Sequence, residues 1–307
     1  MAIPSSGTIS LAGIRAELAT NTYNASATVT ASLEDCSDGT VATINTGNAS
    51  GDRPNGSAPH AMSEFYAYDH DLSSFSDSIS FDLDGTNDYL EGDSGLVAAI
   101  PTTSASISCW VKIDTTSANG LIWALNISGN TQNQIFLLYH NGSGVVRGNF
   151  KGANVANIVD SSTGLENDGE WHHFVMTWQA SSKASGNIVK LYEDGSLQDS
   201  DTIAQSQTFS GTPNLFGFGR NALQNNGQNF NGHINDMAIF NDVLTASEVT
   251  SIYNSGSPKD ESGHSGLQAY YTLENYSNGD TEVDDDSSNS HTLTITNSTD
   301  IDSTDTP

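Results

Sequence analysis

Three carboxylates at alternate positions, Glu166, Asp168 and Glu170, have the spacing in this sequence that most resembles a catalytic pair. Retaining glycoside hydrolases hold two carboxyl groups about 5–5.5 Å apart on one cleft, and alternate residues of a strand face the same side. The intervening residues are Asn167 and Gly169, which favour a turn over a buried strand. We therefore predict a solvated turn at this position and a protein that is not an enzyme.

Two adjacent histidines, His172 and His173, invite a metal-binding or general-base interpretation. Consecutive residues of a strand point to opposite faces, so these two side chains cannot chelate one ion together. We predict a structural role for both. The sequence also lacks a Ser-His-Asp order, a Gly-rich phosphate loop and a Cys/His zinc spacing. No catalytic residue and no organic cofactor is therefore predicted.

The chain of 307 residues is strongly acidic, with 37 Asp plus Glu against 9 Lys plus Arg and a formal net charge of −28. This balance argues against binding to a nucleic acid. Only 15% of the residues are charged and 36% are hydrophobic, which is not the composition of a disordered polyanion. With so few basic groups, we expect an acidic polysaccharide to bind through calcium or not at all.

The cysteines and the hydropathy of the sequence indicate the cellular compartment in which we expect the protein. Cys36 and Cys109 lie in segments of different character, and we predict that both are free thiols. No apolar run approaches the 18 or so residues of a membrane span, and the N-terminus lacks the basic start and apolar run of a secretory signal. We therefore expect no membrane association and synthesis in a cytoplasm without Sec export.

The first 70 or so residues have too little apolar content to fold robustly alone. One helix is predicted at residues 10–19, with Ser10 as N-cap and Leu11, Ile14 and Leu18 on one face. A strand-like run follows at residues 26–33. We expect this segment to be ordered by a partner or by its own oligomer.

From residue 75 onward the sequence changes to short runs with period-two alternation separated by turn residues. This pattern predicts an all-β, antiparallel sandwich. The predicted strands are 78–83, 106–113, 121–127, 134–140, 145–150, 171–178, 187–193, 214–220 and 233–240. Large aromatic residues in these strands, Trp123, Tyr139 and Trp178, are predicted to pack in the core, so no glycan-binding residue is named.

A single short helix interrupts the strands, and its ends are well marked. Thr245-Ala-Ser-Glu248 forms a capping box, Leu244 and Val249 form a hydrophobic staple, and Gly256 supplies the stop. Two further strands, 267–273 and 291–296, are expected to complete the sheets. Residues 298–307 are acidic and are predicted to form a tail.

Several of these segments together resemble the laminin-G-like, concanavalin A-like sandwich family. The matching motifs are Phe81-Asp-Leu-Asp-Gly-Thr-Asn-Asp-Tyr89, Asp168-Gly-Glu-Trp-His-His-Phe-Val-Met-Thr-Trp178, Lys190-Leu-Tyr-Glu-Asp-Gly195 and Gly232-His-Ile-Asn-Asp-Met-Ala-Ile-Phe-Asn241. The resemblance implies a lectin-like jelly roll over residues 75–297. The segments 267–271 and 286–291 look like the family's opening strand and loop, so the order of the strands is permuted here.

The opening Met1-Ala-Ile-Pro-Ser-Ser-Gly-Thr-Ile-Ser-Leu and the segment Met62-Ser-Glu-Phe-Tyr66 resemble virion structural proteins of tailed bacteriophages, particularly marine and cyanobacterial ones. This resemblance implies an N-terminal virion-attachment or oligomerisation segment over residues 1–74. It also implies a non-enzymatic tail fibre, head fibre or capsid decoration subunit that binds host surface glycans. Its expected partners are other virion proteins and copies of itself, with a trimer as the common state for a fibre.

Two alternatives to this function remain open. The first is a purely architectural virion subunit that binds no glycan. The second is a calcium-dependent cellular lectin or adhesin, against which the absence of a signal peptide argues.

A structural calcium ion is also implied by the family resemblance. In relatives, the loop that corresponds to Asp286, Asn289 and His291 approaches the strand that carries Asn235 and Asp236. Calcium takes six to eight oxygen ligands, which these residue types offer. The residue that is usually aspartate in the family is Asn235 here, and a neutral amide weakens an ion site. A hydrated acidic loop without an ion is the alternative.

Overall fold

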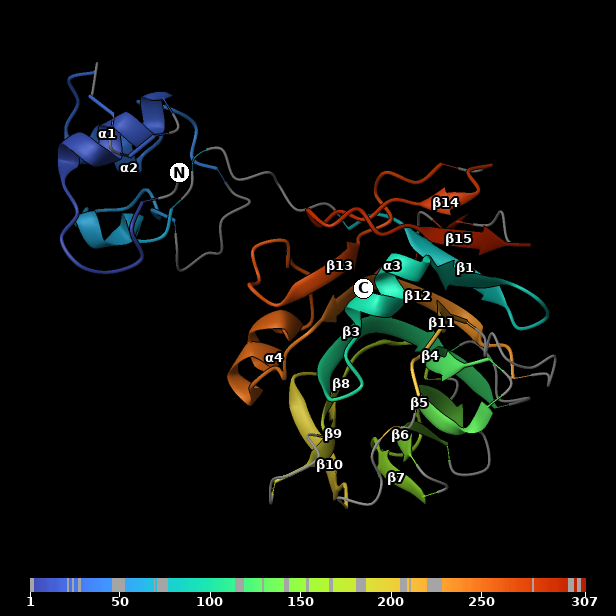
Figure 1. Cartoon of the computed structure of the whole chain (residues 1–307). Helices are drawn as coiled ribbons and strands as arrows, with labels where there is room; N and C mark the ends of the chain where they lie inside the picture. The colour runs from blue at the N-terminus through green and yellow to red at the C-terminus, as the bar shows by residue number, and fades with distance from the viewer. Residues whose placement is uncertain are drawn as a thin grey trace. The chain divides into compact units, whose positions relative to one another are not determined.

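The computed structural model describes residues 3–307 except for residues 21, 24, 27–28, 46–52, 69, 71–76, 114–118, 129, 141–143, 153–154, 166–167, 181–185, 205–208, 210, 220–227, 278, 298–300 and 303–304. The chain forms two compact units, residues 1–75 and residues 76–307 (Figure 1). Among the described residues, no helix has both the length and the apolar character that crossing a bilayer requires.

The N-terminal unit is built on short helices: α1 (Leu11–Thr20), α2 (Leu33–Ser37) and the 3-10 helix η1 (Met62–Phe65). Ser10 caps α1 as predicted, because its hydroxyl oxygen accepts a hydrogen bond from the Gly13 amide at 3.0 Å. The unit has a small apolar core of its own, formed by Ile3, Ile9, Ile14, Leu18, Cys36, Phe65 and Tyr68. This core gives the segment internal order of its own.

The strand expected at residues 26–33 is wrong in the part that the structure describes. Leu33 begins α2, and the residues before it are irregular. The reason is a capping box: the Ser32 hydroxyl accepts from the Asp35 amide, and the Asp35 carboxylate accepts from the Ser32 amide. This local exchange of hydrogen bonds starts a helix where the alternation of apolar residues suggested a strand.

The second unit is a sandwich of two antiparallel sheets, as predicted (Figure 1). Sheet A has the strand order β10-β9-β8-β3-β12-β1-β16, and β13 also pairs with β12. Its strands are β1 (Ser80–Asp84), β3 (Ser104–Ile113), β8 (Trp171–Gln179), β9 (Ile188–Glu193), β10 (Ser196–Thr202), β12 (Asn231–Phe240), β13 (Leu267–Tyr271) and β16 (Ile301–Asp302).

Sheet B has the order β14-β15-β2-β11-β4-β5-β6-β7. Its strands are β2 (Tyr89–Gly92), β4 (Gly120–Ile127), β5 (Asn130–His140), β6 (Val145–Gly152), β7 (Val155–Asp160), β11 (Leu215–Phe218), β14 (Glu282–Val283) and β15 (Leu293–Thr296). The late strands β13 and β15 join different sheets, so the C-terminal part of the chain completes both layers.

The core lies between the two sheets and follows the period-two pattern. Ile107, Cys109 and Val111 of β3 all point into it. Trp123 from sheet B and Trp178 from sheet A are fully buried, and their ring centroids lie 6.3 Å apart. Both cysteines, Cys36 and Cys109, are buried free thiols, as expected from the sequence.

Two helices accompany the sheets, α3 (Ser94–Ala99) and α4 (Ala246–Tyr253). The Thr245 capping box is present as predicted. The predicted stop at Gly256 is wrong by two residues, because Asn254 already has a left-handed backbone (φ 48°) and ends the helix. Asparagine tolerates this conformation better than most residues do.

The acidic tail predicted for residues 298–307 is not separate from the sandwich where the structure describes it. Residues 301–302 form β16 and pair with Ser80 and Phe81 of β1. The Asp305 side chain forms hydrogen bonds to residues of sheet A. The sequence could not indicate this docking, since the tail's own composition is polar.

Candidate functional site

The most unusual local geometry in the sandwich is a bulge in the middle of β12. The register of β12 against β3 shifts between Asn235 and Ala238, and Asp236 has a positive φ of 47°. The first half of β12 pairs with β1, whereas the second half pairs with β13. The bulge therefore lies where β12 changes partner, and such a bulge re-aims the side chains that it carries.

Buried carboxylates gather at this bulge. The Asp236 side chain is 3% exposed and accepts a hydrogen bond from the Tyr270 hydroxyl at 2.6 Å. The neighbouring Asn235 is fully buried and donates from Nδ2 to the Asp77 carboxylate, which precedes β1. Glu261, in the loop after α4, is 5% exposed and interacts electrostatically with Asp236. We call Asp77, Asn235, Asp236 and Glu261 the bulge cluster.

The electrostatics of the bulge cluster oppose negative charge. Burial raises the pKa of Asp77 to about 6 and that of Glu261 to about 7. The pKa of Asp236 lies well above its ordinary value, because of burial first and then because of the nearby Asp77, Glu261 and Asp260. Carboxylates in such surroundings are protonated or neutralised by a cation.

The bulge cluster contains buried carboxylate oxygens that accept no hydrogen bond. Asp77 Oδ2 and Glu261 Oε1 are buried and have no hydrogen-bond partner. The Lys259 ammonium lies 3.8 Å from Glu261 Oε1 and forms an ion pair with it, so Asp77 Oδ2 is the buried oxygen of the two with neither a hydrogen bond nor an ion pair. Buried carboxylate oxygens without a partner are costly, and a hard cation with oxygen ligands would satisfy them. The carboxylate oxygens of Asp77, Asp236 and Glu261 do not all lie within 4.8 Å of one another, so in this structure they are not arranged around a single ion.

The residues predicted for calcium are divided between two places. Asn235 and Asp236 belong to the bulge cluster, whereas Asp286, Asn289 and His291 lie along β13. Asp286 accepts from the Thr272 amide at 2.9 Å and from its hydroxyl at 2.7 Å. Asn289 donates to the carbonyl groups of residues 267 and 268, at 3.1 and 3.0 Å. These side chains fasten the loop to the backbone of β13.

His291 has a similar structural position. Its amide donates to Asp285 Oδ2 at 2.9 Å, and its ring lies 3.5 Å from Asp93. Asp285 also accepts from the amides of Tyr270 and Ser287, so it organises the loop. Asp285 is not among the residues predicted from the sequence, although aspartate often forms turns by accepting a hydrogen bond from the amide two residues further on, as it does here from Ser287.

Asp77 and Glu261 are the functional candidates that the sequence analysis missed. Asp77 is 158 residues away from Asn235 in the chain. Glu261 lies in a polar loop whose composition does not distinguish it from other loops. Only the pairing of β12 with β1 and β13 brings these residues together.

The two adjacent histidines face opposite sides of β8, as predicted. His172 lies between Asp194 (2.9 Å from Nδ1) and Asp168 (3.0 Å from Nε2). The hydrogen bond to Asp194 is the main reason that the pKa of His172 rises to about 9. His172, Glu193 and Asp194 each have a possible metal-ligand atom within 4.8 Å of the other two, and they are the one such group found among the described residues. The Glu193 carboxylate already accepts hydrogen bonds from the Ser162 amide and hydroxyl. This group is thus tied together by hydrogen bonds.

His173 points to the outer face of sheet A. Its Nε2 lies 2.7 Å from the Ser108 hydroxyl, and its ring stacks on Tyr253 of α4 with the centroids 6.1 Å apart. Complete burial lowers its pKa to about 3, so the imidazole is neutral. Its position under α4 is a structural one, in agreement with the prediction.

The turn predicted between Glu166 and Glu170 is present in its described part. Asp168 Oδ1 accepts from the Glu170 amide at 3.0 Å, and Gly169 has a φ of 75°. Glu166 lies outside the described residues. The aromatic residues Trp123, Tyr139 and Trp178 are at most 2% exposed, which confirms that they pack in the core.

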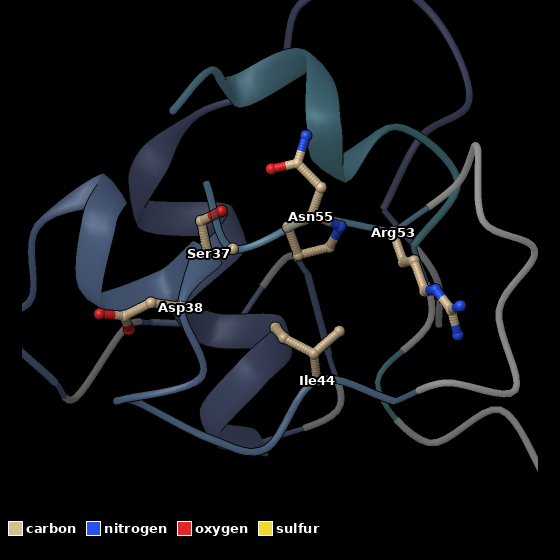
Figure 2. A pocket seen from close by; sticks show the side chains of 7 residues that line it. Ser37, Asp38, Ile44, Arg53 and Asn55 are labelled. Carbon is tan, nitrogen blue, oxygen red and sulfur yellow. The ribbon is translucent and has the colours of Figure 1, made fainter. Parts of the chain in front are cut away.

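The N-terminal unit contains an open hollow of about 430 Å³. Figure 2 shows its lining, in which Asp38 and Arg53 supply charges, Ser37 and Asn55 supply polar groups and Ile44 is apolar. A second hollow of about 350 Å³ is lined by Val29, Thr30, Ala31, Asp35, Thr40 and Val41. Neither hollow contains a histidine or cysteine in its lining.

Comparison with known proteins identifies one matching family. The profile of the Laminin_G_3 family, described as the concanavalin A-like lectin/glucanases superfamily, matches residues 84–250. A curated relative is the sushi, von Willebrand factor type A, EGF and pentraxin domain-containing protein 1 of Rattus norvegicus. It is 26% identical over 196 residues, which are 58% of this chain but only 5% of that protein.

Many solved structures are similar to this chain, and two of them illustrate the range. A proposed carbohydrate-binding protein from Bacteroides ovatus ATCC 8483 superposes with a TM-score of 0.54 at 15% identity, over 75% of this chain and 61% of that one. The native heptameric SAP-like pentraxin of Limulus polyphemus superposes with a TM-score of 0.46 at 13% identity, over 60% of this chain and 86% of that one. The Bacteroides structure shares the sandwich fold.

Proposed function

Because the chain belongs to the Laminin_G_3 family of the concanavalin A-like lectin/glucanases superfamily, we propose that its sandwich unit is a non-catalytic carbohydrate-binding domain. The observation that carries this proposal is the fold, since the matched region 84–250 lies within the unit that forms the two stacked antiparallel sheets. The Bacteroides ovatus protein with the same fold is described as a proposed carbohydrate-binding protein, and its similarity supports the proposal. Domains of this family are typically binding domains.

The placement of the described carboxylates favours binding over catalysis. A glycoside hydrolase presents two carboxyl groups to a substrate on one cleft. In the described part of the sandwich, Asp168 is held by the turn and by His172, whereas Asp236 and Glu261 are buried in the bulge cluster. No two of these three carboxyl groups therefore face a common cleft in which a sugar could bind between them.

A glycan array tests the proposed function. The full chain is labelled and applied to neutral, uronate-containing and sialylated glycans in the presence of 1–5 mM calcium or of EDTA. We expect concentration-dependent binding to a defined subset of glycans. If no glycan on the array is bound in either condition, the proposed function is wrong and an architectural role replaces it.

We also propose that the bulge cluster holds a structural calcium ion. Asp77 precedes β1, Asp236 lies in β12 and Glu261 follows α4. To hold one ion together, their carboxylates must move closer to one another than they lie in this structure. The ion would supply positive charge to oxygens that lack a hydrogen-bond donor.

The biological setting that we propose is a virion, in which the chain is a tail fibre, head fibre or capsid decoration subunit. Support comes from the resemblance of the opening segment and from the compact unit that residues 1–75 form separately. That unit would attach the sandwich to other virion proteins or to copies of the chain. Deleting residues 1–70 tests this role, because a truncated protein that still enters particles would disprove the attachment.

The two alternative roles have distinct signatures. An architectural virion subunit enters particles but binds no glycan on the array. A calcium-dependent cellular lectin binds glycans only with calcium and is absent from particles. Analytical ultracentrifugation of the full chain measures the oligomeric state, for which we propose a trimer.

A further inference from the structure

The outer face of sheet A carries a row of cross-strand neighbours at one end. Lys112 of β3 is paired with Trp171 of β8 on one side and with His233 of β12 on the other. These three residues share a register position, so their side chains project from the same face. The next residue of β3, Ile113, and the next of β12, Ile234, belong to the core. The row therefore faces away from the core.

A carboxylate is bound over this row. Asp305 Oδ2 accepts from the Lys112 ammonium at 2.5 Å, and Oδ1 accepts from the Trp171 indole N–H at 2.9 Å. His233 Nε2 lies 3.8 Å from the same carboxylate. The Ser80 hydroxyl donates to the Asp305 backbone oxygen at 2.6 Å. Three nitrogen atoms of the row thus surround a single carboxylate, a local concentration of donors in a chain with only 9 Lys plus Arg.

The electrostatics agree with this geometry. Burial alone would raise the pKa of Asp305, but the hydrogen bonds from Lys112 and Trp171 outweigh it, and the pKa of Asp305 is lowered. The row thus stabilises the ionised form of the carboxyl group that it holds.

The three donor residues are fixed more firmly in the fold than Asp305, whose carboxylate they bind. Lys112, Trp171 and His233 lie on three adjacent strands inside sheet A, where each strand is paired on both sides. Asp305 follows β16, which has only two residues and forms the edge of the sheet. The donors are therefore preorganised, whereas the segment that carries Asp305 can be displaced at little cost.

The chemistry of the row fits a particular class of ligand. An ammonium and an indole N–H together bind a carboxylate by charge-assisted hydrogen bonds. The half-buried Trp171 adds an apolar ring beside them, and its centroid lies 6.1 Å from that of His233. Aromatic rings of this kind provide the flat apolar contact that sugar rings accept. A sugar with a carboxyl group would satisfy both parts of the row.

We propose that Lys112, Trp171 and His233 form a binding site for the carboxylate of an acidic sugar, a hexuronate or a sialic acid, and that Asp305 occupies this site in the absence of a glycan. The inference rests on the proposed carbohydrate-binding function and names the site and the class of ligand. Because Asp305 competes with the ligand, the apparent affinity of the full chain is lower than that of the empty site.

Isothermal titration calorimetry tests the site. The probes are trigalacturonate and its neutral methyl ester, and sialyllactose and neutral lactose. The proteins are the full chain, a chain that ends at Asp300 and the full-length variant Asp305→Ala. We expect the truncated chain and Asp305→Ala to bind the carboxylated probes about tenfold more tightly than the full chain does. In both proteins the Asp305 carboxylate no longer competes with the probe for its charge-assisted hydrogen bonds. The neutral probes should bind at least tenfold more weakly.

Two variants of the chain that ends at Asp300 identify the residues. Lys112→Gln should lose about tenfold or more in affinity for the carboxylated probes. Lys190→Gln is the matched control. It removes the same charge from β9 of the same sheet, but Lys190 lies outside the row. The melting temperature of each variant is measured, and Trp171→Phe serves as a second variant that keeps a ring but removes the N–H donor.

The contradicting outcomes are distinct. If the truncated chain binds neutral glycans on the array but neither carboxylated probe, the inference is wrong and the proposed function stands. If it binds no glycan of any kind, both are wrong. Equal losses in Lys112→Gln and Lys190→Gln would place the ligand elsewhere. If a peptide of residues 297–307 binds the truncated chain while no carboxylated sugar does, the site is one for strand exchange between copies.

Discussion

At the scale of single residues, the clearest electrostatic feature is His172 between two aspartates. Hydrogen bonds to Asp194 and Asp168 raise its pKa to about 9, against an ordinary value of 6.5. The folded state therefore binds a proton more tightly than the unfolded state does. The resulting stabilisation is complete below pH 6.5 and is lost as the pH rises from 6.5 through 9.

We predict that His172→Gln lowers the stability of the sandwich near pH 6 by on the order of 1 kcal/mol after allowance for solvent screening. The difference between the variant and the wild type should shrink as the pH approaches 9.5. Urea unfolding at several pH values between 6 and 9.5 measures it. A difference that stays constant over this range would show that the imidazolium does not contribute.

A second prediction at this scale concerns the carboxylates around residue 168. Glu166→Gln and Glu170→Gln should leave the hydrolysis of chromogenic glycosides at background, as in the wild type. The reason is that Asp168 and Glu170 form a turn, and the Asp168 carboxylate accepts a hydrogen bond from the Glu170 amide. A wild-type rate well above background that either variant abolishes would contradict this prediction.

At the scale of elements, the bulge in β12 links two partner strands through buried carboxylates. Calcium should raise the melting temperature of the full chain, and EDTA should lower it. With calcium at 100 times its dissociation constant the gain is about 2.7 kcal/mol. For a unit of this size that corresponds to about 5–10 °C.

Variants separate the bulge cluster from the loop along β13. Asp236→Asn and Glu261→Gln should abolish the response to calcium, because they remove ligands from the cluster. Asp286→Asn should lower the melting temperature equally with and without calcium, because Asp286 holds the backbone of β13. If Asp286→Asn alone abolishes the response, the ion binds in the loop as the sequence suggested.

The helix α4 supports the outer face of sheet A. Tyr253 of α4 stacks on Trp110 of β3, with the ring centroids 5.8 Å apart. Thr245→Ala removes the cap of this helix and should cost about 1 kcal/mol. Differential scanning calorimetry measures the change. Ser247→Ala, at an exposed position in the same helix, is the control and should have little effect.

Most strands could be predicted from the sequence, and β10 shows a physical reason why a strand can be missed. The strand β10 is exposed along nearly its whole length, so its sequence has no apolar alternation. It is held instead by pairing with β9 at the edge of sheet A. A pattern of hydrophobicity reveals a strand only where one face is buried.

At the scale of the whole molecule, the chain has two units with separate cores. We predict two transitions in calorimetry of the full chain. A chain that lacks residues 1–75 should lose the smaller transition and keep both the larger one and glycan binding. A sandwich that fails to fold after this deletion would show that its stability depends on the N-terminal unit.

The sequence by itself determined the two sheets, the capped helix and the free thiols. It could do so because alternation, capping and burial are properties of neighbouring residues. Its charge also argued against nucleic acid as a ligand. The overall scarcity of Lys and Arg led to the expectation that an acidic polysaccharide binds only through calcium. Composition cannot reveal that Lys112, Trp171 and His233 lie next to one another, and this local arrangement underlies our proposal of direct carboxylate binding.

Only the tertiary structure brought Asp77 to Asn235, and Lys112 to Trp171 and His233. These contacts depend on strand order, on register and on a one-residue bulge, and a shift of one residue would turn every side chain of a strand to the other face. Register between strands that lie far apart in the chain is set by packing of the whole core. The candidate sites are therefore a product of the fold.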